Sequence, residues 1–203
     1  MRRWTKPLAA VLTAALLCGA AGVAAAPGEE LSLSMLGAGI RPAGGDMRFA
    51  ARLEKTAFFE EYREEFSFGV LIVPESLLTQ AGYDPDELTL ESAGAVAARY
   101  GMSQADIVFH AAGVYAEDET SLTFTGVFPA IPREQYDTPM VGRAFVQRGE
   151  DVWYADPLIR TFYGVAEQAA PRQSDGEMAK TLAELLTSAG RTAAPAQETE
   201  AAA

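Results

Sequence analysis

Apolar and polar residues alternate along two early segments of the chain, and the period then changes. Residues 29–40 and 47–53 follow a two-residue alternation, which predicts two half-buried strands with a glycine-rich turn between them. Between residues 56 and 66 the aromatic side chains fall at helical spacing, so we expect a short amphipathic helix capped by Thr56. The β-prone run at 67–73 predicts a buried strand.

The middle of the chain predicts further strands joined by polar turns. Residues 92–100 are rich in alanine, a composition that favours a short helix. Residues 106–111 and 121–131 are predicted strands, which could pair as a hairpin across a long acidic connection. Residues 140–147 and 152–154 predict another strand pair, across a polar turn that contains glycine.

Two helices are predicted near the C-terminus. Asp156 and Pro157 suit the N-cap and the first position of one helix. Ser174 and Glu177 suit a capping box at the start of the second, which continues to Gly190. The order of elements predicts an α+β fold: a mainly antiparallel, sandwich-like β-sheet with a short helix after the second strand and these two C-terminal helices.

The expected organisation is one domain with flanking segments. We predict a signal peptide at 1–25, a short N-terminal segment at 26–37, a single α+β domain at 38–190 and a disordered tail at 191–203. The tail is rich in alanine, threonine, glutamate and proline, and it has too little apolar surface to fold.

The first 25 residues have the layout of a secretory signal peptide. Arg2, Arg3 and Lys6 precede an apolar stretch that is shorter than the roughly 20 residues of a bilayer-spanning helix. Small residues follow, and Ala25 suits the position just before the cleaved bond. The sequence therefore predicts a secreted, extracellular protein. Twin-arginine export and lipid attachment at Cys18 fit less well, because the flanking residues depart from both motifs.

The net charge and the single cysteine limit which partners and which kinds of catalysis we expect. The chain has 16 basic and 28 acidic residues, a formal charge of −12, and removal of residues 1–25 takes away three cations and leaves −15. Such a surface repels nucleic acids and anionic membranes, so we expect neither as a partner. Cys18 is the only cysteine and leaves with the signal peptide, so we expect no disulfide, no thiol nucleophile and no thiolate metal ligand.

Catalytic motifs are sparse. The chain lacks the G-x-S-x-G and S-x-x-K patterns of serine enzymes, and a serine triad would depend on His110, the only histidine. Two carboxylates could act as in glycosidases, but the glutamates at 60–65 are more simply the solvated side of a helix. The acidic turns at 84–87 and 117–119 could hold calcium, although ordinary acidic loops are the simpler interpretation. We predict no catalytic residue, no metal site and no cofactor.

Five side chains are the candidates for ligand contact: Arg48, Arg143, Trp153, Tyr154 and Arg160. The arginines lie within predicted strands or in the first turn of a predicted helix, where a cation needs a specific partner; a structural ion pair is the simpler interpretation and a ligand clamp the alternative. The two aromatic residues could stack on a sugar. Because neighbouring strand residues point to opposite faces, only one of them could be exposed, and core packing is the simpler role.

Several short segments resemble a module that recurs in secreted and surface proteins of Firmicutes. The segments are Gly39-Ile40-Arg41, Met47-Arg48-Phe49, residues 68–74, 124–132 and 143–146, and Tyr154 to Arg160. In the module they typically read G-A-S-I-R, G-L-R-F, Y-G-T-L-I-x-P, a strand ending in N-I-P, A-R-x-Y-V and Y-x-D-x-x-x-R-S. The match spans residues 38 to about 170. Departures are Ala130 before Ile131-Pro132, Phe145 for tyrosine and Thr161 for serine.

The resemblance implies an accessory domain of the envelope or extracellular space, and its motifs carry no catalytic signature. The sequence thus favours a secreted, non-catalytic accessory or binding module whose partner is a cell-surface glycan or protein. The alternative is a carboxylate-dependent hydrolase that acts on extracellular polysaccharide.

Overall fold

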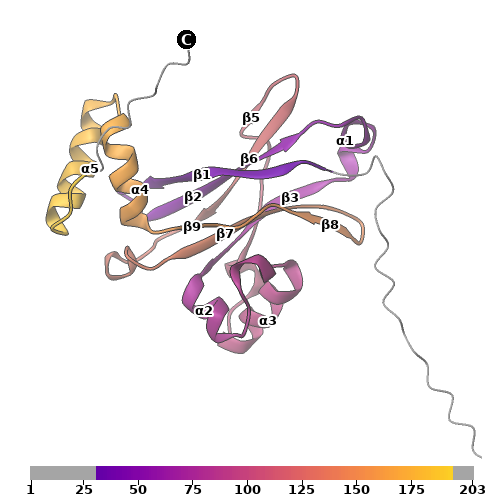
Figure 1. Ribbon diagram of the computed structural model, residues 1–203, viewed down its shortest axis with the longest axis horizontal. Helices are drawn as coiled ribbons and strands as arrows, with labels where there is room; N and C mark the ends of the chain where they lie inside the picture. Colours follow the sequence, from indigo (N-terminus) through magenta and orange to yellow (C-terminus); the bar gives the residue numbers. More distant parts are fainter. Residues whose placement is uncertain (1–30, 194–203) are drawn as a thin grey trace, which may run out of the picture. The chain divides into compact units, whose positions relative to one another are not determined.

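The computed structural model describes residues 31–193, which form two antiparallel β-sheets (Figure 1). Sheet A has the strand order β1 (Leu33–Arg41), β2 (Asp46–Glu54), β6 (Ser121–Phe128), β5 (Ala116–Glu117). Sheet B has the order β4 (Val108–His110), β3 (Ser67–Pro74), β7 (Met140–Arg148), β8 (Asp151–Tyr154), and β9 (Leu158–Arg160) also pairs with β7. The predicted α+β fold with mainly antiparallel sheets is confirmed.

Five α-helices lie within residues 31–193 and pack against these sheets. They are α1 (Ala57–Glu61), α2 (Glu75–Gln80), α3 (Leu90–Tyr100), α4 (Phe162–Ala169) and α5 (Gly176–Ser188). Helices α2 and α3 lie against sheet B, whereas α4 and α5 lie together at one end of the sheets, with α4 beside β1 (Figure 1).

Sheet B is buried on both faces. Along β3, Val70 and Ile72 belong to the core between the two sheets, while Leu71 and Val73 belong to a second core under α2 and α3. All four side chains are fully buried. A strand with two buried faces has no polar alternation, which explains the uninterrupted apolar run at 68–73.

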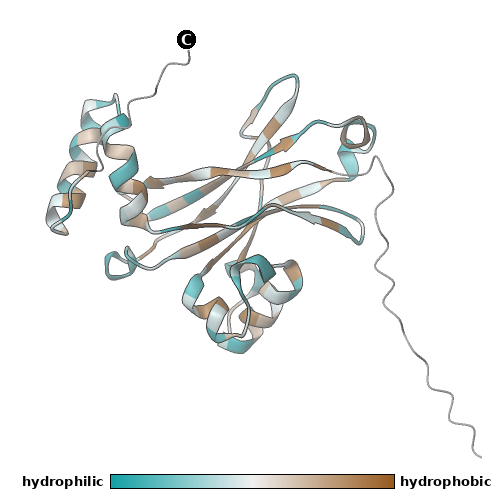
Figure 2. Cartoon of the chain, in the orientation of Figure 1, coloured by the Kyte–Doolittle hydropathy of each residue, from teal (hydrophilic) through white to brown (hydrophobic). Residues whose placement is uncertain are grey.

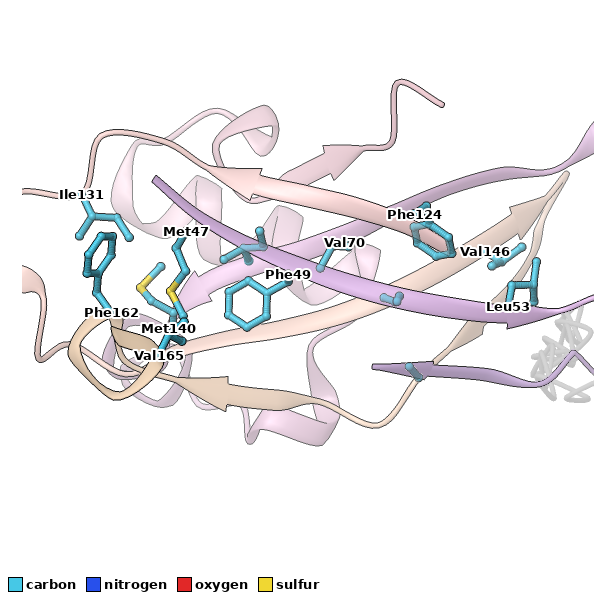
Figure 3. Close-up of a cluster of buried hydrophobic side chains, with 14 of the residues drawn as sticks. Met47, Phe49, Leu53, Val70, Phe124, Ile131, Met140, Val146, Phe162 and Val165 are labelled. Atoms are coloured by element: carbon cyan, nitrogen blue, oxygen red, sulfur yellow. The ribbon is translucent and has the colours of Figure 1, made fainter. Parts of the chain in front are cut away.

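Sheet A is buried on one face only. Along β2, Met47, Phe49, Ala51 and Leu53 are fully buried, and the residues between them carry the polar alternation. Figure 2 shows apolar and polar residues interleaved along these strands. Figure 3 shows the inward side chains meeting those of β3, β6 and β7; it labels Met47, Phe49, Leu53, Val70, Phe124, Met140 and Val146.

The helix predicted after the second strand begins where expected and ends early. The Thr56 hydroxyl accepts a hydrogen bond from the Phe59 N–H at 3.1 Å, which confirms the cap. Helix α1 then stops at Glu61, and a 3₁₀ turn over Arg63–Glu65 leads into β3.

The first of the two C-terminal helices exists, but its predicted start at Asp156-Pro157 is wrong. Residues Leu158–Arg160 form β9, which pairs with β7 so that Arg160 lies opposite Met140. Helix α4 starts only afterwards, and its cap is Thr161, whose hydroxyl accepts a hydrogen bond from the Gly164 N–H at 2.9 Å. Hydrogen bonds to β7 satisfy the backbone N–H and C=O groups of β9, which a helix would have satisfied locally. Because β7 is remote in the sequence, the local pattern does not reveal this pairing.

The predicted hairpin between residues 106–111 and 121–131 is also wrong. Strand β4 pairs with β3 in sheet B, and β6 pairs with β2 in sheet A. The short strand β5 in the connection is the hairpin partner of β6. The chain therefore crosses from one sheet to the other between β4 and β5.

Three smaller corrections concern helices. Helix α2, which the sequence did not indicate, follows β3 directly. Helix α3 is the predicted alanine-rich helix, but it begins at Leu90 rather than at residue 92. The last helix is capped by Asp175 rather than Ser174: the Asp175 carboxylate accepts a hydrogen bond from the Glu177 N–H at 2.9 Å.

The folded part is longer at both ends than the predicted 38–190. Leu31 belongs to the main core and β1 begins at Leu33, so residues before 38 are part of the sheet. Beyond Gly190, Arg191 pairs with Asp137 and with Glu167, the latter at 2.7 Å. The predicted signal peptide, its cleavage after Ala25 and residues 194–203 of the predicted tail lie outside the described residues.

The acidic turn at 117–119 joins sheet A to the segment around α1. Nη1 and Nη2 of Arg63 donate to the Glu117 carboxylate at 2.9 and 2.8 Å, and Lys55 pairs with the same carboxylate. The Asp118 carboxylate accepts hydrogen bonds from Thr120 and Ser121. The carboxylates of Glu117 and Asp118 thus have partners within the protein.

This turn predicts an acid-dependent loss of stability. The hydrogen bonds from Arg63 and Lys55 lower the pKa of Glu117 from 4.5 to about 2. Because the pKa of Glu117 is lower in the folded protein than in the unfolded chain, its contacts with Arg63 and Lys55 stabilise the fold above pH 4.5. This stabilisation is lost as the pH falls towards 2 and the carboxylate is protonated. We expect urea denaturation to show Glu117→Gln less stable than wild type at pH 6, with a difference that shrinks between pH 4.5 and 2. A difference that stays constant with pH would contradict this role of the carboxylate.

Candidate functional site

One face of sheet A points away from the core and from the helices that cover sheet B. We call it the open face: the outward side chains of β1, β2 and β6 together with Tyr115, which precedes β5. Its members are Leu36, Gly39, Arg48, Ala50, Arg52, Thr123, Thr125, Val127 and Tyr115. Leu36 and Tyr115 are large side chains with exposed fractions of 54% and 67%. Exposed apolar and aromatic groups on a sheet face are typical of contact surfaces.

The open face is hollowed on both sides of Arg48. One hollow of about 400 Å³ lies towards α5 and is lined by Gly39, Ile40, Arg41, Asp46, Arg48, Val127 and Met178. A second, of about 360 Å³, lies towards β5 and is lined by Leu36, Gly37, Ala38, Gly39, Arg48, Ala50, Tyr115 and Thr125. Gly39 and Arg48 line both, so the two hollows are parts of one surface.

Small side chains form the floor of this surface. Gly39 lies opposite Arg48 in the register of β1 and β2, and Ala50 lies opposite Thr125 in that of β2 and β6. A β-carbon added at Gly39 would meet no atom within 4 Å, so the space above this glycine is open. A ligand could therefore approach the backbone of β1 closely.

Arg48 and Tyr115 stand together on the open face. The guanidinium carbon of Arg48 lies 5.5 Å from the centre of the Tyr115 ring, a cation–π distance. Arg48 is exposed, and it has no ion pair with any carboxylate of residues 31–193. The pair presents a cation and an aromatic ring side by side.

Arg52 is the second cation on this face. It follows Arg48 by four residues of β2 and lies opposite Ser34 and Thr123. Its Nε is buried and has no hydrogen-bond partner in the described part of the chain. A buried donor without an acceptor is costly, so this nitrogen lowers the stability of the fold.

Arg41, at the end of β1, is already neutralised. Its Nε donates to the Asp46 carboxylate at 2.6 Å, and the Ala130 N–H donates to the same carboxylate at 3.1 Å. The hydrogen bond from Ala130 and the contact with Arg41 lower the pKa of Asp46. Asp46 is thus held ionised as a structural partner at one end of the open face.

Arg143 lies on the opposite side of the molecule's main core and has a structural role. Its Nε donates to the Ala155 carbonyl at 2.7 Å, and its Nη1 donates to the carbonyls of Asp86 and of Leu88, the latter at 3.3 Å. Burial lowers the pKa of Arg143. The expected carboxylate partner is replaced by backbone carbonyls, which hold the loop before α3 and the segment after β8 against β7.

Trp153 and Tyr154 point to opposite faces of β8, and both pack. The Trp153 ring lies 6.2 Å from that of Phe58 and 6.0 Å from that of Phe66. The Tyr154 hydroxyl accepts a hydrogen bond from the Leu90 N–H at 3.0 Å, and Arg143 lies over its ring. Both side chains are half-buried and are held by contacts within the protein.

Arg160 stands on β9, not in a helix, so the argument from an unfavourable helix position does not apply. Its Nη1 donates to the Ile159 carbonyl at 2.8 Å. Of the five residues predicted to contact a ligand, only Arg48 lies on the open face of sheet A. The other four lie on sheet B.

Sequence reasoning missed Arg52, Tyr115 and the glycine floor. Arg52 could have been found, because alternation along β2 places it on the same face as Arg48. Tyr115 lies in a long connection whose position depends on the crossing between sheets, and no local pattern reveals it.

Three other features of the described residues concern metal ligands, the histidine and membrane-spanning helices. Within 31–193, no group of three His, Asp or Glu side chains is placed to hold a metal ion. The His110 ring packs edge-on to Phe145 at 5.5 Å. Within the same residues, no helix combines the length and apolar character needed to cross a bilayer.

The comparisons with known proteins add no relative. The chain matches no protein-family model, no curated protein and no solved structure. The resemblance to the module of Firmicutes surface proteins stays a prediction from its motifs.

Proposed function

We propose that the chain is a secreted, non-catalytic binding module of the bacterial cell envelope or extracellular space, with a glycan or protein as its partner. The observation that carries the proposal is the open face: sheet B is covered on both sides, whereas sheet A leaves one side free. This free side holds Arg48 and Tyr115 over a floor of small residues, and Arg52 lies further along β2.

The groups on this face suit binding better than catalysis. Arginine keeps its proton at all physiological pH values, so it binds and orients anions but does not act as a general acid or base. Asp46 is the acid among the residues that line the two hollows, and it is engaged by Arg41 and Ala130. This favours the module over the hydrolase, which needs two available carboxylates.

The binding role is tested with a glycan array and with fractions of bacterial envelope. We expect the wild-type chain to retain a ligand and Arg48→Gln or Tyr115→Ala to lose most of it. Arg99→Gln is the matched control, because Arg99 also lies over a tyrosine, Tyr100, at 5.9 Å, but on α3. If wild type retains nothing from either source, or if Arg48→Gln binds as well as wild type, the proposal fails.

Secretion is tested by expressing the full chain in a secreting bacterium. We expect the product in the medium to begin at Ala26, measured by intact mass and N-terminal sequencing. Replacing the three cations of the N-terminus with glutamate should keep the precursor in the cells. A product that stays in the cytoplasm with residues 1–25 attached would contradict secretion.

A further inference from the structure

We infer that the open face binds a linear polysaccharide that carries carboxylates, laid along β2 across Arg48 and Arg52. The inference rests on the proposed binding function and names the chemical class of the ligand. Its basis is the pair of arginines on one strand face, together with the surface that separates them.

The spacing of the two arginines fits an extended polymer. Arg48 and Arg52 are four residues apart on the same face, roughly 13 Å along the strand at about 3.3 Å per residue. Ala50 lies between them, so the surface between the two cations is low. An extended chain with repeated carboxylates could engage both guanidinium groups along this stretch of β2.

The state of the two guanidinium groups favours an incoming carboxylate. Neither has a carboxylate partner among residues 31–193. Arginine binds carboxylates through two parallel hydrogen bonds, which a planar group makes with little loss of freedom. Asp46 and Glu54 are the two end residues of β2, so Arg48 and Arg52 between them confine the positive charge to the middle of the strand.

The remaining groups suit a sugar chain. Tyr115 is 67% exposed beside Arg48, and an exposed ring can stack on the apolar side of a sugar. Ser34, Thr123 and Thr125 place hydroxyl groups along the two sides of β2, where they can bond sugar hydroxyls. A nucleic acid fits poorly, because its charge density of about one per 1.7 Å needs many more cations than two.

The test measures binding of the full chain to polygalacturonate, with dextran as a neutral glycan and polyglutamate as a carboxylate polymer without sugars. We expect binding to polygalacturonate that weakens with added salt, and little binding to the other two. Arg48→Gln and Arg52→Gln should each weaken binding about tenfold, and Arg52→Lys less than Arg52→Gln. Gly39→Glu should abolish it, because it places a carboxylate opposite Arg48 in open space. Arg99→Gln should bind as wild type does.

The outcomes separate this inference from the proposed function. Equal binding to dextran, or tighter binding to polyglutamate, would overturn the carboxylated sugar as the ligand. No binding to any of the three, with Arg48-dependent retention of envelope material, would overturn the inference and leave the binding function standing. Circular dichroism and thermal melting confirm that each variant is folded before its affinity is compared.

Discussion

Replacing Phe49 with alanine is expected to lower the free energy of unfolding by about 4 kcal/mol, because it removes a fully buried ring and leaves a cavity. Phe49 is on β2 and its ring faces β7 across the interior between the two sheets (Figure 3). A β-carbon built at Gly142 of β7 would lie 2.7 Å from Cε1 and Cγ of this ring, and closer still to Cδ1. Urea denaturation gives the change directly.

The contact between these two residues predicts strong non-additivity. Gly142→Ala alone should destabilise the fold by about 2 kcal/mol, because the ring must move in a packed core. In the Phe49→Ala background the same substitution should cost far less, since the ring is gone. Gly39→Ala is the control, because its added methyl group meets no atom within 4 Å. Additive effects of the Phe49 and Gly142 substitutions would contradict the described packing.

Replacing Arg143 with methionine is expected to lower the free energy of unfolding by about 3 kcal/mol. The substitution keeps a long side chain but removes the donors for the carbonyls of Asp86, Leu88 and Ala155. Unsatisfied buried acceptors cost about 1–3 kcal/mol each, and water can reach part of this site, which limits the total. Denaturation with urea is again the measurement.

Arg143→Lys distinguishes the effect of the positive charge from that of the directed hydrogen bonds. Arg143→Lys keeps the positive charge but cannot direct two nitrogens at once to Ala155 and to the loop before α3, so we expect an intermediate stability. If Arg143→Met matched wild type in stability, the structural role assigned to Arg143 would be wrong.

Elements that depend on local pattern were predicted well. Alternation identified β2, and the continuous apolar run identified β3, because each pattern reports how many faces of a strand are buried. The cap at Thr56 was found for a similar reason, since a hydroxyl at that position bonds a backbone N–H three residues on.

Elements that depend on remote partners were missed. Strand β9 exists because β7 offers it a ladder, and Asp156-Pro157 looks locally like a helix start. The separation of β4 and β6 into different sheets is equally a long-range property. The same limit applies to the candidate site: Arg48 could be predicted from its strand, but Tyr115 comes to lie over it only through the chain crossing between sheets.

The unequal burial of the two sheets has a consequence for how such a protein can diverge. Substitutions in β3 or β7 must fit two packed cores at once, so few will be tolerated there. The outward positions of β2 and β6 meet solvent on their free side, and changes at them leave both cores intact. Sequence drift should therefore concentrate on the open face, and descendants of one ancestor could exchange ligands while their frameworks stay superimposable.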